Sequence, residues 1–241
     1  MRVLWVLVLL AGCDATLVDM DAIYTRGAPN YVMCGMNIDD KSSASLDAIG
    51  GALDRAQIDG TTVLLYAHKP GDEPGATVDP EIVELALAGV ADRGMTFATY
   101  ADLDAGEVPG SLALAFDDAS LDAWTAMRPT FMHYGARVTF FVSEYMHMTD
   151  AEKVELHQLA ADGHDIEYHS VHHWNAKDYA NAHGADAYIN DDILPGLEAM
   201  RADGYDPHMF AYPFGAHTTA TDDALRPYFR HVRAIYSTCP Y

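Results

Sequence analysis

The sequence predicts a single α/β domain folded as a closed or distorted barrel. Three observations lead to this prediction: short apolar runs alternate with helical patterns, no internal repeat or long linker divides the chain, and half of the 241 residues are hydrophobic. Strands that alternate with helices are typical of βαβ units and a parallel sheet. A barrel of this length is commonly one domain, and its function is expected at the carboxyl ends of the strands.

Eight short apolar runs are predicted to be strands. They are residues 31–36 (YVMCGM), 62–67 (TVLLYA), 95–99 (MTFAT), 111–116 (SLALAF), 137–142 (RVTFFV), 165–169 (DIEYH), 208–212 (HMFAY) and 231–236 (HVRAIY). Two helices between them have clear boundary signals. One has Asp79 as N-cap, Pro80 in its first turn and Gly94 at its end, and another opens with the capping-box pair Thr149 and Glu152. Seven or eight such strand–helix units suggest a barrel.

The charge of the chain excludes some partners. There are 36 acidic residues against 14 Lys and Arg, and the formal net charge is -22. Nucleic acid and anionic membrane surfaces are therefore poor partners. An acidic surface suits a neutral or cationic ligand, although solubility or a salty habitat is the simpler explanation.

The first thirteen residues, MRVLWVLVLLAGC, resemble an export signal. Their apolar run is too short to span a bilayer as a helix. The ending LLAGC resembles a bacterial lipobox, which implies cleavage before Cys13 and lipid attachment to its thiol; an ordinary signal peptide or a buried first strand is the alternative. We therefore expect a lipoprotein signal at 1–13, a tether at 14–29 and one domain at 30–241, held on the periplasmic side of the cell envelope.

Two further cysteines, Cys34 and Cys239, lie near the two ends of the mature chain. Thiols in an oxidising compartment can pair. A disulfide is possible if the two ends form neighbouring strands of a closed barrel.

Three polar motifs follow predicted strands. They are the aspartate pair in LALAFDDAS, the three histidines in DIEYHSVHHW, and the tight loop in FAYPFGAH. Each alone has an ordinary explanation as a helix cap, a packed polar side chain or a turn. Neighbouring side chains of a regular strand point to opposite faces, so two adjacent aspartates reach one pocket only if the chain bends there.

In order and spacing, AFDD, RVTFFVSE, GHDIEYHSVHH and FAYPFG resemble the polysaccharide deacetylases of carbohydrate esterase family 4 over residues 112–215. The histidine strand that follows the proline loop in most members is found here at the front, as GTTVLLYAHKPG, with its helix and the next strand in residues 77–103. The chain is thus similar to a circularly permuted member, of the kind that acts on poly-β-1,6-N-acetylglucosamine. The resemblance implies a distorted (β/α)7-like barrel.

The resemblance also implies a metal site. Asp118, His169 and His173 would be the ligands, and His172 would point elsewhere, because residues four apart share one face of a helical turn. One carboxylate and two imidazoles suit Zn²⁺ with an open position, and Co²⁺ or Ni²⁺ would fit nearly as well.

Three catalytic roles are implied by the same resemblance. Asp117 would be the general base that deprotonates the water activated by the metal, and His68 would be the general acid that protonates the leaving amine. The backbone N–H of Phe214 would help to stabilise the oxyanion.

The chain departs from the family pattern at two places. Ala211 occupies the position of an arginine that orients the base in most members, and His68 follows one residue more than expected, so it needs a bulge or an early strand end. Asp39 and Asp40 either correspond to a further aspartate motif of the family or cap the next helix.

We therefore predict an exported, lipid-anchored, metal-dependent hydrolase that removes N-acetyl groups from an N-acetylglucosamine-containing polysaccharide and releases acetate. The alternatives are a peptidoglycan or chitooligosaccharide deacetylase, a catalytically weak carbohydrate-binding lipoprotein, and a structural barrel without metal. Retention of Asp117 favours an enzyme, since a binding protein needs no aspartate beside the metal-binding one.

Overall fold

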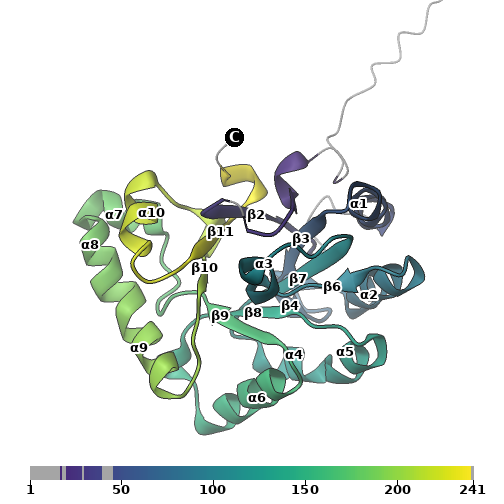
Figure 1. Ribbon diagram of the computed structural model, residues 1–241. Helices are drawn as coiled ribbons and strands as arrows, with labels where there is room; N and C mark the ends of the chain where they lie inside the picture. Colours follow the sequence, from purple (N-terminus) through teal and green to yellow (C-terminus); the bar gives the residue numbers. More distant parts are fainter. Residues whose placement is uncertain (1–16, 18–19, 29, 40–45, 240–241) are drawn as a thin grey trace, which may run out of the picture.

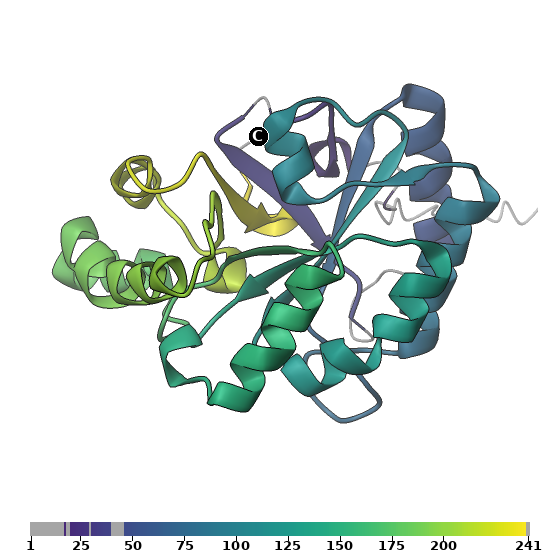
Figure 2. The ribbon, with the colours of Figure 1, turned by 60° about the horizontal axis from the view of Figure 1, so that its bottom comes forward.

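The predicted barrel is confirmed by the computed structural model, which describes residues 17, 20–28, 30–39 and 46–239 (Figures 1 and 2). Seven parallel strands form a closed ring in the order β3, β2, β11, β10, β9, β8, β7 and back to β3. Their bounds are β2 (Val32–Asn37), β3 (Thr62–Ala67), β7 (Ser111–Asp118), β8 (Thr139–Val142), β9 (Asp165–Tyr168), β10 (Met209–Ala211) and β11 (His231–Ile235). This strand order does not contradict the predicted circular permutation, which stays a prediction.

The remaining strands lie outside the ring. Among the described residues, β6 (Thr96–Phe97) pairs with the start of β7 and with no other strand, so the predicted strand 95–99 is not a member of the closed ring. β1 (Tyr24–Thr25) pairs antiparallel with β3, and β4 (Lys69–Pro70) pairs with β5 (Thr77–Val78) in a separate ribbon.

Most of the helices surround the strands (Figure 1). They are α1 (Leu46–Asp59), α2 (Pro80–Asp92), α4 (Leu121–Ala126), α5 (Arg128–Tyr134), α6 (Asp150–Ala161), α7 (Ala176–His183), α8 (Ala185–Tyr188), α9 (Leu194–Ala202) and α10 (Thr219–Leu225), with the π-helical turn η4 (Ile189–Ile193) joining α8 to α9. The short helix α3 (Tyr100–Ala105) lies against the amino-terminal ends of β8 and β9, where its first backbone N–H groups donate to Thr139 and Asp165. Asp79 caps α2, and Thr149 and Glu152 form the predicted capping box of α6.

The two faces of a ring strand pack against different parts of the protein. Along β7, Leu112, Leu114 and Phe116 pack among the helices, whereas Ala113 and Ala115 lie in the separate interior cluster of the barrel. Strands that are buried on both faces read as continuous apolar runs, which explains why the sequence predicted them. Because the alternation continues along β7, the side chain of Asp117 also lies on the interior face.

The segment assigned to a tether packs on the barrel in its described part. Ile23, in the short helix η2 (Asp21–Ile23), is fully buried, and Tyr24 and Thr25 pair with β3. The packed domain therefore includes residues that precede Asn30, because their apolar side chains find a place against the barrel.

The disulfide between Cys34 and Cys239, which the sequence left open, is present with a Cα–Cα distance of 5.9 Å. It joins β2 to the residue after the short turn η6 (Tyr236–Thr238), which follows β11, and β2 and β11 are neighbours in the ring. The lipid attachment predicted at Cys13 lies outside the described residues. Within the described ranges, no helix is both long enough and apolar enough to cross a membrane.

Candidate active site and metal centre

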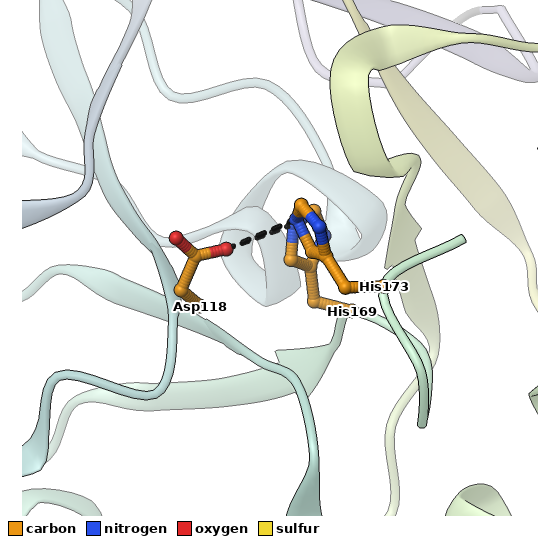
Figure 3. A group of neighbouring side chains, drawn as sticks. All are labelled: Asp118, His169 and His173. Atoms are coloured by element: carbon orange, nitrogen blue, oxygen red, sulfur yellow. Dashed lines mark ion pairs between the residues drawn. The ribbon is translucent and has the colours of Figure 1, made fainter. Parts of the chain in front are cut away.

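Asp118, His169 and His173 come together at the carboxyl ends of the strands (Figure 3). One ligand atom from each lies within 4.8 Å of the other two. Oδ1 of Asp118 is 3.1 Å from Nε2 of His173 and 3.6 Å from Nε2 of His169. In Figure 3 the carboxylate at the end of β7 faces both imidazoles, which project from the loop after β9.

An unusual backbone surrounds this cluster. Among the described residues, five that are not glycine have a positive φ, and all lie at or just beyond the carboxyl ends of β7 to β10. They are Asp118 (83°), Glu144 (56°), Ser170 (74°), His173 (54°) and Phe214 (59°). Such sparsely populated conformations tend to gather at functional sites. The positive φ of Asp118 supplies the bend that two adjacent aspartates require in order to serve one pocket.

The second ring nitrogen of His169 fixes the orientation and tautomer of its imidazole. Nδ1 lies 2.8 Å from the carbonyl oxygen of Ala211, so Nδ1–H donates there and Nε2 keeps its lone pair for the cluster. Burial lowers the pKa of His169 to about 4, against the opposing charges of Asp117 and Asp118. The imidazole is thus neutral at pH 7, as a metal ligand must be.

The loop that carries both histidines is not helical, so the predicted helical turn is wrong. Residues 169–175 lie between β9 and α7, and the two positive φ values, rather than helical spacing, turn both imidazoles toward Asp118. Asp192, in the π-helical turn, supports the loop from outside: its Oδ1 accepts the N–H of His172 at 2.6 Å and its carbonyl oxygen accepts that of Val171 at 3.0 Å. His172 is exposed and stacks on Trp174, pointing elsewhere as expected.

Asp117 lies inside the barrel and is 3% exposed. Its Oδ2 accepts a hydrogen bond from Nη2 of Arg233, a β11 side chain that is 1% exposed. Its Oδ1 is buried and has no hydrogen-bond partner among the residues that the structure describes. One oxygen is therefore anchored and the other is left to accept a proton.

His68 reaches the same end of the barrel without a bulge. β3 pairs with β7 residue by residue from Thr62 to Ala67 and then ends, so the early strand end is the alternative that applies. The ring of His68, just beyond the end of β3, lies edge-on to that of Tyr66 at 5.7 Å.

Asp39 holds His68 by two contacts. Its Oδ2 lies 2.6 Å from Nδ1 of His68, and its Oδ1 accepts the backbone N–H of His68 at 3.0 Å. Burial lowers the pKa of His68, but the hydrogen bond to Asp39 and the charges of Asp117, Asp39 and Asp118 outweigh it and raise the pKa to about 9. Of the two alternatives for this aspartate pair, the structure thus favours a site role for Asp39; Asp40 lies outside the described residues.

The proline loop, η5 (Pro213–Gly215), follows β10. Phe214 is 59% exposed, and its ring lies 4.8 Å from that of His173. Gly215 has a φ of 61°, and a Cβ atom there would stand 2.5 Å from Cγ1 of Ile235, so only glycine fits this turn. The backbone role predicted for Phe214 stays a prediction.

Two hollows open at this end of the barrel, and one of them is lined in part by the cluster. One, of about 320 Å³, is lined by residues that include Asp118, Glu144 and His173. The other, of about 530 Å³, is lined by residues that include Asp39 and Tyr66. In strand order they lie on opposite sides of β3, whose end carries His68.

The ligand atoms of Asp118, His169 and His173 match the chemistry of the predicted metal ions. One carboxylate oxygen and two imidazole nitrogens, one of them oriented by a backbone carbonyl, match the ligands of a catalytic Zn²⁺, Co²⁺ or Ni²⁺ site. The three protein ligands leave room for water or substrate. These residues therefore fit the metal.

Sequence reasoning missed the contact between Arg233 and Asp117. Its signal was a single arginine inside the apolar run HVRAIY, which is unusual for a strand buried on both faces. The partner could not be read from the sequence, because 116 residues separate the two side chains.

Comparisons with known proteins agree with this geometry. Residues 106–228 match the family model described as polysaccharide deacetylase, whereas no curated protein matches the chain. The chain is similar to the solved structure of IcaB from Ammonifex degensii, with 18% identity, a TM-score of 0.60 and coverage of 73% of this chain and 85% of that one.

Two further solved structures are similar. The deacetylase PplD of Streptococcus pyogenes, in complex with acetate, has 19% identity, a TM-score of 0.58 and coverage of 70% of this chain and 80% of its own. The BpsB deacetylase domain from Bordetella bronchiseptica has 14% identity, a TM-score of 0.52 and coverage of 89% and 96%. At these identities the likeness establishes the fold.

Proposed function

The chain belongs to the polysaccharide deacetylase family, and we propose that it removes N-acetyl groups from an N-acetylglucosamine-containing polysaccharide by metal-dependent hydrolysis. The observation that carries the proposal is the convergence of Asp118, His169 and His173, with Asp117 and His68 at the same end of the barrel. A metal-binding set flanked by an acceptor and a donor of protons is what hydrolysis of an unreactive amide requires.

Asp118, His169 and His173 would hold the divalent cation, with Zn²⁺ as first choice and Co²⁺ or Ni²⁺ as alternatives. When bound, this cation supplies a Lewis acid that lowers the pKa of a water molecule and polarises the acetamide carbonyl.

The proton transfers fall to two residues of the chain. Asp117 takes a proton from the attacking water through Oδ1, while Oδ2 stays on Arg233. As the new C–O bond forms and the C–N bond breaks, His68 gives a proton to the leaving nitrogen. A pKa of about 9 keeps His68 protonated at neutral pH, and the contact of Nδ1 with Asp39 leaves Nε2 as the donor.

The backbone N–H of Phe214 is proposed to donate to the oxyanion that develops on the carbonyl oxygen. The exposed ring of Phe214 beside His173 supports a place for this loop at the rim of the site. The products are acetate and a glucosamine unit, whose amine is cationic at neutral pH. A net charge of -22 attracts such a product strand.

A polymer is the favoured substrate because one hollow is lined by Asp118 and His173, and a second, lined by Asp39 and Tyr66, opens at the same end of the barrel. Each has the size of a small-molecule pocket, so sugar units next to the reacting one have room to bind. Export to an oxidising compartment is supported by the disulfide between Cys34 and Cys239. Lipid attachment at Cys13 and a periplasmic location are part of the proposal.

The test pairs metal content with acetate release. Purified protein is incubated with poly-N-acetylglucosamine, peptidoglycan and chitooligosaccharides, and bound metal is measured by mass spectrometry. We expect Asp118→Asn to lose both metal and activity. Asp117→Asn is expected to keep the metal and lose about 10²- to 10⁴-fold in kcat, the usual contribution of a general base.

His172→Gln is the matched control, because His172 lies in the same loop but stacks on Trp174. It should keep both metal and activity. The substrate that is turned over fastest decides between the polymer and the alternative deacetylase substrates. If metal is bound but no substrate yields acetate, the protein is a carbohydrate-binding protein and not an enzyme. If no metal is bound, the proposed metal centre is refuted.

A further inference from the structure

Arg233 is a buried cation in the interior of the barrel. Its Nη2 donates to Oδ2 of Asp117, and its guanidinium lies 4.3 Å from the ring centre of Tyr66 and 5.1 Å from that of Phe141. The faces of aromatic rings attract a cation, so both rings help to hold the guanidinium in place. The side chain is thus fixed on several sides.

The neighbouring strands leave space for this arginine. Arg233 stands in register with Ala211, the position at which the family resemblance predicts an arginine. Ala211 belongs to the same interior cluster as the two flanking rings, and neighbouring strands are about 4.8 Å apart, so long side chains at both positions would compete for one space. Gly35 contributes as well, because a Cβ atom there would stand 3.1 Å from Cδ of Arg233.

We propose that Arg233 is the positioning residue of Asp117 and replaces, from the next strand, the missing arginine of the proline loop. This inference rests on the proposed function, in which Asp117 is the general base. A hydrogen bond from a guanidinium to one carboxylate oxygen fixes the rotation of the carboxylate. Oδ1, which has no hydrogen-bond partner in the described part of the chain, is then held in one direction for the attacking water.

The first test is Arg233→Met, assayed for kcat, KM, bound metal and folding by circular dichroism. We expect kcat to fall about 10²-fold, within the range of general-base effects, while KM and metal content change less than about twofold. Ala211→Arg combined with Arg233→Ala returns a guanidinium to the loop position. This double variant should recover at least about tenfold of the lost kcat, which a merely structural role of Arg233 does not predict.

A second comparison uses the Asp117→Asn background, where removal of the cation leaves no unpaired buried charge and folding is retained. There, Arg233→Met should leave the residual kcat unchanged, because Arg233 acts through Asp117. The matched control is Arg230→Met: Arg230 lies three positions earlier, is 61% exposed in its side chain and pairs with Asp104. It should have wild-type kcat.

The outcomes separate the two proposals. If the wild type releases acetate and Arg233→Met has the same kcat, the positioning role is overturned and the proposed function stands. An equal loss in the Asp117→Asn background also overturns the positioning role, since Arg233 would then act independently of the base. If the wild type releases no acetate, the proposed function fails and this role fails with it.

Discussion

Acid is expected to weaken the fold through His164, a buried histidine outside the site. It lies between α6 and β9 and is 7% exposed. Its Nδ1 accepts the backbone N–H of Val138 at 3.2 Å, and its ring packs edge-on against Phe131 at 5.1 Å and Phe140 at 5.5 Å. Protonation of Nδ1 would break this hydrogen bond and place a charge among aromatic rings.

The sign and size of the effect follow from the pKa of His164. Burial lowers it from 6.5 to about 4, so the unfolded chain binds the proton first as the pH falls. The contribution of this residue to stability is complete above pH 6.5 and is lost between about pH 6.5 and pH 4. At 1.36 kcal/mol per pH unit, the loss in the free energy of unfolding is about 3 kcal/mol.

Urea unfolding of the wild type and of His164→Asn at several pH values between 7.5 and 4 measures this loss. Asparagine keeps an acceptor near Val138 but does not titrate, and the difference between the two proteins cancels the effect of other acidic and basic groups. We expect the advantage of the wild type to shrink by about 3 kcal/mol toward pH 4.

The control is Leu156→Ala, which removes a fully buried side chain without a proton equilibrium. It should cost about 2–5 kcal/mol at every pH. If the difference between the wild type and His164→Asn is the same at pH 7.5 and pH 4, the neutral, buried state of this histidine is refuted.

Three further predictions concern the disulfide, the proposed acid and the histidine loop. Replacement of Cys34 and Cys239 by alanine removes a cross-link between residues 205 positions apart and should lower the free energy of unfolding, measured by urea titration, by about 2–5 kcal/mol. An unchanged free energy of unfolding after reduction of the wild type would contradict this. Asp39→Asn removes the contact that raises the pKa of His68, so the alkaline limb of the kcat/KM profile should move from about pH 9 to lower pH, and an unmoved limb would exclude His68 as the acid. Gly196→Ala would place a Cβ atom against the Tyr168 hydroxyl of β9, so calorimetry should show a loss of about 1–3 kcal/mol in the free energy of unfolding, and metal titration a weaker affinity. Unchanged values would show that α9 does not support the loop that carries His169 and His173.

The strands of the ring were predictable because their apolar runs are largely buried on both faces and are bounded by turn and cap residues, whereas the run at 95–99 is partly exposed and lies outside the ring. The metal ligands were implied by the family resemblance. The carboxyl ends of parallel strands meet at one end of a barrel, which is consistent with that expectation. Asp118 ends β7 and His169 follows β9 directly, so the barrel brings these two near one another, whereas His173 reaches them through the loop after β9.

The sequence did not reveal the contacts that orient these groups. Arg233 meets Asp117 across 116 positions, and Asp39 meets His68 across 29, because the register of neighbouring strands decides which side chains share a face. Local spacing suggested a helical turn for the two histidine ligands, whereas positive φ angles and the support from Asp192 shape that loop.

Taken by itself, then, the sequence determined the barrel and the motifs at the site, because apolar periodicity and motif order are local properties of a chain. It left the pairing of Cys34 and Cys239 open, because this depends on which strands are neighbours in the ring. Only the tertiary structure decided how each group is held and oriented. Hydrogen-bond partners distant in sequence come together through strand register and closure of the ring, and these depend on the packing of the whole domain.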